Sequence, residues 1–312
     1  MKENRKTVLT FGACGMELDL FAPSQPQANE SALCSAAPIL YFGGRAGNSA
    51  LALCSFGASS ALCSVVGNDF LGEKVLAYYE QKGIDTRFIC QSETCGTALL
   101  THINAGADGK ASLLYSGACP AISEAQLEKA LESKPDLLLA NLDLPFERVY
   151  FAVRTAREMG IPVVLDATNA PCDLNLSTLD EMEAVIADED AVHRLTGVFP
   201  GGVDDCMRAA LALSRCVKAR YYILHLADRG CYLYDGRLPH FVAGYRTAYK
   251  DPRGAMEAFC AAICAALAGG GAEMNTACYF ASAAYALTAS KVGTSNAFPT
   301  LSEISYLMTG KA

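Results

Sequence analysis

Residues 251–259, with the sequence DPRGAMEAF, open an Ala-rich stretch of helical length. Small residues such as Gly254 and Ala255 at a helix N-terminus let backbone amides and the positive end of the helix dipole face an anion. A carboxylate in the first turn, here Glu257, either caps the helix or acts as a general base for a nearby hydroxyl. The segment is therefore a candidate site for chemistry on an anionic substrate.

A second glycine-rich segment, residues 43–50 with the sequence GGRAGNSA, leads into another predicted helix. The paired glycines Gly43 and Gly44 allow a ligand to approach the backbone closely. Asn48, on the first helical turn, can hydrogen-bond a hydroxyl. Any glycine turn before a helix looks similar, so this segment alone is a weak indication of a site.

Carboxylates follow four successive predicted strands, at Asp143, Asp166, Asp188 and Asp228. In an open parallel sheet, ligands bind beyond the carboxyl ends of the strands. Asp also favours turns and helix caps, which explains most single instances. Four in succession are better explained by a ligand site along this edge.

The elements that must position these residues alternate between strand and helix. The predicted strands are residues 7–11, 60–66, 135–142, 161–165, 183–187 and 221–226. The predicted helices are one opened by Gly43 and Gly44 that runs to about residue 55, then residues 70–81, 146–159, and about 255–268 and 276–290. This order indicates an α/β fold with a mostly parallel central sheet and helices on both faces.

Two segments break this alternation. Residues 20–40 are irregular and rich in proline, and residues 97–116 read as a hairpin with a turn at 105–109. We expect a single domain over 1–312, with a small β lid from about 14–40 and 96–118. The lid would mediate a homodimer through apolar residues such as Leu99, Leu100 and Ile103, because pairing hides its open face and edges. The alternative is a lid that folds back on its own domain.

Composition narrows the class of partner. The chain has 312 residues and a formal net charge of −8, which argues against nucleic acid as a partner. No signal sequence or membrane span is recognisable, so we expect a cytoplasmic protein with no membrane partner. The 14 cysteines show no Cys-x-x-Cys spacing and the four histidines are scattered. We therefore expect reduced thiols and no zinc site.

Taken together, the two glycine-rich segments resemble the signature motifs of the PfkB/ribokinase family of carbohydrate and nucleoside kinases. They lie about 200 residues apart in the order that the family has, and the resemblance covers essentially the whole chain. Further matches fall at residues 67–72, at 195–197 and around Gly230. A Rossmann dehydrogenase fits less well, because residues 12–15 lack the Gly-x-Gly-x-x-Gly spacing.

The resemblance implies a ribokinase-like fold and an ATP-dependent transfer of phosphate to a hydroxyl of a small-molecule sugar or nucleoside. It implies Mg²⁺ as a cofactor and K⁺ as a further candidate. ATP would lie across the carboxyl ends of the C-terminal strands, with the sugar under the lid. Positioning and electrostatics dominate such a reaction.

The same resemblance assigns roles to individual residues. Glu257 is the expected base, and the amides of Gly254, Ala255 and Met256 form the expected anion hole. The expected sugar or nucleoside contacts are Glu17 (or Asp19, if the loop is longer), Gly43, Gly44, Asn48 and Asp143. The expected nucleotide or phosphate contacts are Asp188, His225, Ala227, Gly230 and Arg253, the last equally well explained as a solvated loop arginine. Asp251 matches a position that often lines a monovalent-cation site.

The residues expected to surround the nucleotide and the transferred phosphate depart from the family pattern at four places. Glu257 replaces Asp, Met256 replaces Gly, Asp188-x-x-Ala191 replaces Asn-x-x-Glu, and residues 225–230 replace Thr-x-Gly-x-x-Gly. Met256 would put a bulky side chain in the anion hole and disfavour a positive φ there. Two functions therefore stay open: an active kinase, or a catalytically impaired member that binds a sugar or nucleoside.

Overall fold

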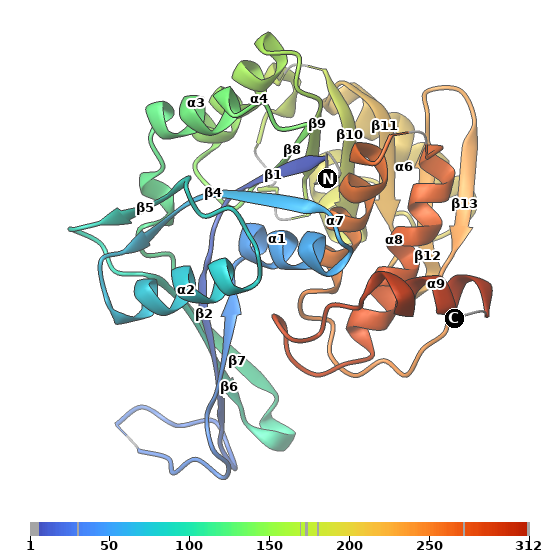
Figure 1. Cartoon of the computed structure of the whole chain (residues 1–312). Coiled ribbons are helices and arrows are strands. Elements are labelled where there is room, and N and C mark those ends of the chain that lie inside the picture. The colour runs from blue at the N-terminus through green and yellow to red at the C-terminus, as the bar shows by residue number, and fades with distance from the viewer. Residues whose placement is uncertain are drawn as a thin grey trace.

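A mostly parallel sheet with helices on both faces forms the body of the molecule (Figure 1). The structure is a computed structural model and describes residues 6–29, 31–168, 170–171, 174–179, 181–270 and 272–310. Within these ranges, nine strands form the main sheet in the order β13-β12-β11-β10-β9-β8-β1-β4-β5. The neighbouring strands from β11 to β5 pair in parallel, and β12 and β13 join antiparallel at one edge.

The strands of the main sheet are short and apolar. They are β1 (Thr7–Phe11), β4 (Ser59–Gly67), β5 (Ile89–Ser92), β8 (Leu137–Asn141), β9 (Val163–Asp166), β10 (Met182–Asp188), β11 (Ala219–His225), β12 (Gly230–Tyr234) and β13 (Pro239–Ala243). Every residue of β8 and β9 is buried, as expected for central strands covered by helices on both faces. Because β1, β8, β9, β10 and β11 run in parallel, their carboxyl ends lie along one edge of the sheet.

Two sets of helices cover the sheet. One face carries α3 (Glu124–Glu132), α4 (Phe146–Glu158), α5 (Glu189–Thr196) and α6 (Val203–Cys216). The other carries α1 (Arg45–Ser55), α2 (Phe70–Gln81), α7 (Ala255–Ala268), α8 (Met274–Ala289) and α9 (Leu301–Thr309).

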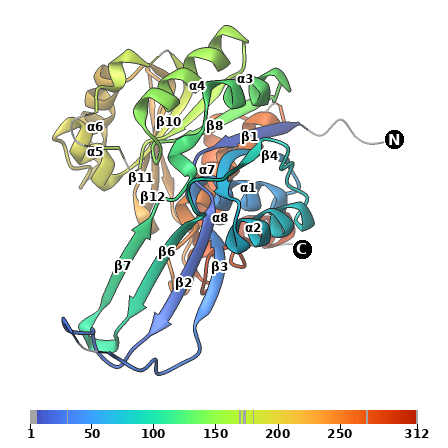
Figure 2. The same cartoon turned by 90° about the vertical axis from the view of Figure 1, so that its left-hand side faces the viewer.

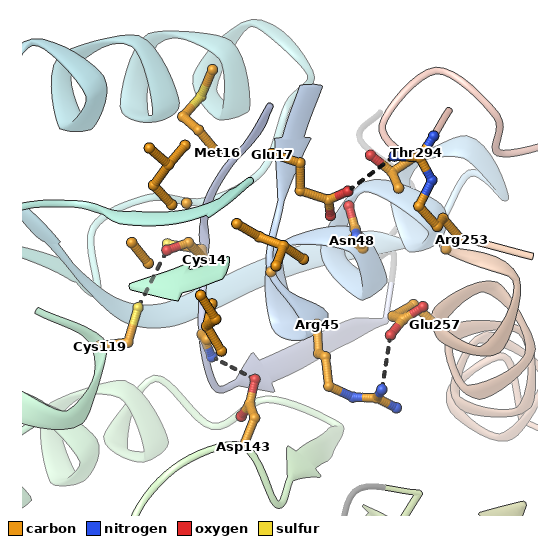
Figure 3. Close-up of a pocket in the computed structure, with 18 of the residues that line it drawn as sticks. Cys14, Met16, Glu17, Arg45, Asn48, Cys119, Asp143, Arg253, Glu257 and Thr294 are labelled. Atoms are coloured by element: carbon orange, nitrogen blue, oxygen red, sulfur yellow. Dashed lines mark hydrogen bonds and ion pairs between the residues drawn. The ribbon is translucent and has the colours of Figure 1, made fainter. Parts of the chain in front are cut away.

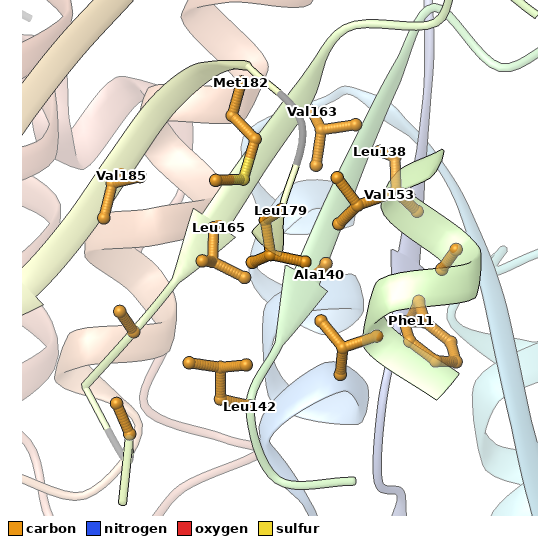
Figure 4. Packing of buried hydrophobic residues seen from close by; sticks show 14 of the residues in the cluster. Phe11, Leu138, Ala140, Leu142, Val153, Val163, Leu165, Leu179, Met182 and Val185 are labelled. Carbon is orange, nitrogen blue, oxygen red and sulfur yellow. The ribbon is translucent and has the colours of Figure 1, made fainter. Parts of the chain in front are cut away.

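Each face of the sheet has its own hydrophobic core. Figure 4 shows part of the first, where Leu138, Leu165 and Val185 from three strands pack with Val153 of α4. In the second core, α7 is built largely of Ala and Cys and is buried on nearly all sides. Burial in this core fixes the N-terminus of α7 relative to the strand ends.

A separate four-stranded sheet, which we call the lid sheet, projects from the main body (Figure 2). It contains β3 (Ile39–Gly43), β2 (Gly15–Phe21), β6 (Ala98–Asn104) and β7 (Lys110–Tyr115), in that order. β2 pairs antiparallel with β3 and parallel with β6, and β6 pairs antiparallel with β7. In this register Asp19 lies opposite His102.

The expected α/β fold is confirmed, and most predicted bounds agree with the structure to within one to three residues. The bounds of α2 and α7 agree at both ends. The interpretation of residues 20–40 as irregular is wrong at both ends, because β2 runs to Phe21 and β3 begins at Ile39. Within the described part of the chain, no helix combines the length and hydropathy that a membrane crossing requires.

Candidate active site

The N-terminus of α7 begins at a glycine in the left-handed region. Gly254 caps the helix with φ 75°, and a Cβ there would lie 3.2 Å from the ring of Phe298. Met256 lies inside the helix, and the positive φ belongs to Gly254. The expectation that Met256 conflicts with a positive φ at its own position is therefore wrong, because the helical backbone there suits any L-residue. Its side chain is half-buried.

At the N-terminus of α1, the backbone also packs too closely against its neighbours to leave room for a side chain. Gly44 has φ 86°, and a Cβ there would lie 2.5 Å from the carbonyl oxygen of Ala13. A Cβ on Gly43 would lie 2.4 Å from Oε1 of Glu17. The two glycines thus let the backbone pack directly against the residues that lead into β2 and against the Glu17 carboxylate on that strand.

Arg45 connects the two helix N-termini. Its Nη1 lies 3.2 Å from Oε1 of Glu257 (Figure 3). Its Nη2 lies 2.5 Å from Oδ2 of Asp166. Nη2 also donates to the hydroxyl of Thr168. Burial lowers the pKa of Arg45, but the charges of Asp166 and Glu257 outweigh it and raise the pKa above its ordinary value. A permanently charged guanidinium therefore lies beside the expected base.

A cavity of about 480 Å³ lies between these helix N-termini and the lid sheet. Predicted residues that line it are Glu17, Gly44, Asn48, Asp143, Arg253, Gly254, Met256 and Glu257. The sequence did not indicate Arg45, His102 and Leu114 as lining residues. Leu99 and Leu100, expected at a dimer contact, also line this cavity. The floor is polar and charged, whereas the lid sheet contributes mostly apolar side chains.

Several buried polar atoms around this first cavity have no hydrogen-bond partner among the described residues. They are Oε2 of Glu17, Oδ1 of Asn48, Nε2 of His102 and Oδ1 of Asp143. Leaving such atoms unpaired costs free energy unless a ligand or water pairs with them. Three of these atoms are oxygens that accept hydrogen bonds, which suits a ligand with several hydroxyls.

The two lining carboxyls Glu17 and Asp143 titrate close to neutral pH. Burial raises the pKa of Glu17 to about 7, although the positive charge of Arg253 opposes the rise. Burial also raises the pKa of Asp143 to about 6, with Arg45 opposing. Asp143 accepts a hydrogen bond from the amide of Ala13 at 3.2 Å, which fixes its position at the end of β8.

A second cavity of about 300 Å³ lies at the carboxyl ends of β10 and β11. Four predicted residues line it: Asp188, His225, Ala227 and Met256. Asp188 accepts a hydrogen bond from the amide of Ala191 at 2.8 Å and caps α5. Met256 and Pro252 line both cavities, so the two spaces meet at the N-terminus of α7.

The loop beside the second cavity has an unusual backbone. Ala227 has φ 52°, the left-handed conformation that glycine adopts without strain. Gly230 has φ 105°, and a Cβ there would lie 2.0 Å from the carbonyl oxygen of Val242. Gly230 therefore shapes the loop, although it is not among the described residues that line the cavity.

Five predicted residues among those described lie outside both cavity linings: Asp19, Gly43, Gly230, Asp251 and Ala255. Asp19 and Asp251 each accept hydrogen bonds from Arg253. Arg253 itself, predicted near the nucleotide, lines the first cavity. Among the described residues, no group of three or more His, Cys, Asp or Glu side chains is placed to hold a metal ion.

Comparison with known proteins identifies the family. The model of the pfkB family carbohydrate kinases matches residues 5–301. The ribokinase of Bacillus subtilis (strain 168) is 26% identical over 309 residues, covering 97% of this chain and 100% of the relative. A structure of the Arabidopsis thaliana ribokinase complexed with ribose and ATP superimposes with a TM-score of 0.85 at 17% identity, covering 98% of this chain and 99% of that one.

The chain belongs to the pfkB family of carbohydrate kinases. This confirms the resemblance that the two glycine-rich segments indicated. The fold is likewise confirmed as ribokinase-like, since the superposition extends over nearly the whole of both chains.

Proposed function

We propose that this protein transfers the γ-phosphoryl group of ATP to a hydroxyl of a sugar or nucleoside. The observation that carries the proposal is the meeting of two cavities at the N-terminus of α7, where Glu257 lines the first and Met256 lines both. An acceptor in the first cavity and a nucleotide in the second would bring a hydroxyl and a phosphate together at this helix terminus. The Arabidopsis thaliana ribokinase, which shares the fold and was solved in complex with ribose and ATP, supports this assignment.

The first cavity would hold the acceptor. Glu17, Asn48 and Asp143 offer the unpaired buried atoms that hydroxyl groups can satisfy. Such pairing would orient the acceptor so that one hydroxyl lies beside Glu257.

Glu257 would act as the general base. In the transfer, the acceptor oxygen forms a bond to the γ-phosphorus, the bond between that phosphorus and the bridging oxygen of ATP breaks, and the hydroxyl proton passes to Glu257. The Ala255 amide already donates to the Pro252 carbonyl oxygen and the Ala258 amide to that of Gly254. The amides of Gly254, Met256 and Glu257 are therefore the donors left for an anion at this helix terminus, and the Ala255 amide, expected among them, is not one of these donors.

The second cavity would hold the nucleotide with its Mg²⁺. Magnesium prefers oxygen ligands and is commonly bound by one or two carboxylates together with substrate phosphates. Asp188 and Glu189 line this cavity, and one oxygen of Asp188 is already used in capping α5. Glu189 also pairs with Arg229 at 2.5 Å. These carboxylates fit such an ion, whose chemistry is to neutralise charge on the phosphates.

A coupled ADP-release assay over pentoses, hexoses and nucleosides tests the proposal. Glu257→Gln keeps the shape of the side chain and removes the base, so kcat should fall about 100-fold or more. The rise in Tm that the acceptor sugar causes should persist. Glu128→Gln, on the exposed face of α3, is the matched control and should retain the parent rate. Turnover of Glu257→Gln at the parent rate would show that Glu257 is not the base and serves only as the ion-pair partner of Arg45.

A sugar- or nucleoside-binding protein without efficient transfer is the second candidate. It is favoured by the side chain of Met256, which lies where the two cavities meet, and by the ion pair that engages Glu257. This function predicts a rise in Tm with a sugar, none with Mg–ATP, and no ADP release with any acceptor.

We also propose a homodimer formed through the lid sheet, in a cytoplasmic protein. Leu40, Leu113 and Tyr115 of this sheet are exposed, whereas Leu99, Leu100 and Ile103 are half-buried. Exposed apolar side chains on a sheet with free edges favour pairing between copies. A monomer by light scattering at micromolar concentration would contradict the dimer.

A further inference from the structure

Arg253 lies between the loop that precedes α7 and the lid sheet. Its Nη2 lies 2.7 Å from Oδ2 of Asp251, and its Nε lies 3.1 and 3.0 Å from the two oxygens of the same carboxylate. Its Nη1 donates to Oδ1 of Asp19, on strand β2, at 2.8 Å. The guanidinium carbon is also 5.5 Å from the ring centre of Tyr41, on β3. One side chain thus links the α7 loop to two strands of the lid sheet.

The carboxylate of Asp251 is fully engaged by these contacts. Oδ2 accepts a third hydrogen bond, from the amide of Gly293 at 3.1 Å, and Oδ1 also accepts from the amide of Arg253 at 3.1 Å. Burial raises the pKa of Asp251, but these hydrogen bonds outweigh it and leave the pKa below its ordinary value. A K⁺ ion at this carboxylate would have to displace the guanidinium or share a half-buried site with its charge. The residues present therefore do not fit a monovalent cation.

The surroundings of Arg253 are rich in negative charge. Asp19 and Asp251 are within hydrogen-bond distance, and Oε2 of Glu17 is 4.0 Å from Nη1. The side chains of Asp19 and Glu17 are only 4% and 7% exposed. Buried carboxylates require a compensating cation, and a bidentate guanidinium is well suited to this geometry.

We infer that Arg253 is a built-in cation that joins Asp251 of the α7 loop to Asp19 of the lid sheet, so that this connection needs no monovalent metal ion. The guanidinium is covalently part of the chain, so its presence beside Asp251 does not depend on the salt in the solution. The lid sheet and the α7 loop stay linked in any electrolyte. The inference does not depend on the proposed kinase activity, since it concerns the stability of the linked arrangement.

Thermal unfolding in different chloride salts at one ionic strength tests the inference. Tetramethylammonium is the control cation, because it is too large to replace K⁺ at a carboxylate. The parent should have the same Tm in potassium and in tetramethylammonium chloride, because Arg253 already supplies the positive charge. Arg253→Thr should lower the Tm by about 5 °C in tetramethylammonium chloride, since it leaves buried carboxylates without a partner. K⁺ should restore part of this loss by entering the space that the guanidinium leaves. Arg246→Thr, which removes an exposed arginine a few residues earlier in the chain, should leave the Tm unchanged in both salts.

Three results would overturn the inference: a parent Tm that rises in K⁺ relative to tetramethylammonium, an Arg253→Thr variant as stable as the parent, or a loss of Tm that K⁺ does not restore. If Arg253→Thr does not fold, Arg253→Lys provides the test. It keeps the charge and loses the bidentate geometry, so its Tm should fall and stay insensitive to K⁺. A K⁺-dependent Tm in this variant would contradict the inference.

Limited proteolysis tests whether Arg253 stabilises the lid sheet itself. Residues 22–29 and 31–38, between β2 and β3, include many exposed positions. Their cleavage should be several-fold faster in Arg253→Thr than in the parent under native conditions, because the loss of Asp19 as a partner frees strand β2. Equal cleavage rates would show that Arg253 does not hold the lid sheet.

Discussion

Nη1 of Arg45 lies 3.2 Å from Oε1 of Glu257, so an ion pair joins the first turn of α1 to the first turn of α7 beside the first cavity. The same guanidinium lies 2.5 Å from Asp166 at the end of β9, whose side chain is completely buried. Arg45 therefore serves two carboxylates, one structural and one in the proposed active site. Its removal should affect stability and turnover together.

Arg45→Met should destabilise the protein by about 3–5 kcal/mol, because it leaves the buried carboxylate of Asp166 without its cation. Urea unfolding measures the change. Arg148→Met, which breaks an exposed pair with Glu124, is the control and should change the unfolding free energy by about 1 kcal/mol or less. Equal effects of the two variants would show that the buried pair does not support the fold.

Met256 and Glu257 should act together in phosphoryl transfer. Met256→Gly would widen the junction of the two cavities, and Glu257→Asp would restore the shorter carboxylate of the family pattern. We expect the double variant to raise kcat/KM and the two changes to be non-additive, because both act on one transition state. Each change has a cost: glycine destabilises a helix by up to about 1 kcal/mol, and a shorter side chain lengthens the contact with Arg45.

A double-mutant cycle of kcat/KM, with Tm measured in parallel, separates these effects. If the double variant turns over no faster than the parent, the junction at Met256 does not limit transfer. The altered loop of residues 225–230 and Ala191 would then be the next positions to change.

The pKa of Glu17 predicts how sugar binding depends on pH. A carboxylate that accepts hydrogen bonds from hydroxyls binds best when ionised, so affinity should rise as pH increases through about 7 and level off about one pH unit above it. Calorimetric titration across this range measures the effect. Glu17→Gln should remove it, whereas a residual change centred near pH 6 would belong to Asp143.

Ionisation of Glu17 should lower the free energy of unfolding, although it raises the affinity for the sugar. The folded state holds the Glu17 proton up to a pH of about 7, whereas the unfolded chain releases it near 4.5. The contribution of Glu17 to the unfolding free energy is therefore fully present below about pH 4.5 and is lost as pH rises through 7. A parent whose stability relative to Glu17→Gln does not fall between these values would contradict the raised pKa.

Local patterns in the sequence were sufficient to predict much of the fold. Glycine stops and apolar periodicity located α1, α2, α4 and α7, and the two glycine-rich segments identified the family. Helix α6 was missed although its buried residues Cys206, Ala209, Ala210 and Leu213 follow a helical spacing. Strand β2 was missed although Met16, Leu18 and Leu20 alternate with Glu17 and Asp19, the spacing of a half-buried strand.

The candidate site was predictable where a residue belongs to a motif. Asn48, Asp143, Gly254 and Glu257 line one cavity as a group. Arg45 and His102 were missed for a physical reason: their roles depend on partners distant in the sequence. Asp166 lies 121 residues from Arg45, and only the register of the lid sheet places His102 near Glu17.

The backbone of Ala227 predicts a stabilising substitution. An L-residue with φ 52° is strained by about 1–2 kcal/mol. Glycine removes this strain in the folded state, but it also increases the entropy of the unfolded chain, which offsets part of the gain. Ala227→Gly should therefore raise the unfolding free energy by about 0.5–1 kcal/mol. Ala125→Gly, in the exposed first turn of α3, should lower it, because glycine there only weakens a helix. Opposite signs for the two variants in urea unfolding are the expected result, and an Ala227→Gly protein less stable than the parent would show that the loop does not hold this residue in the left-handed conformation.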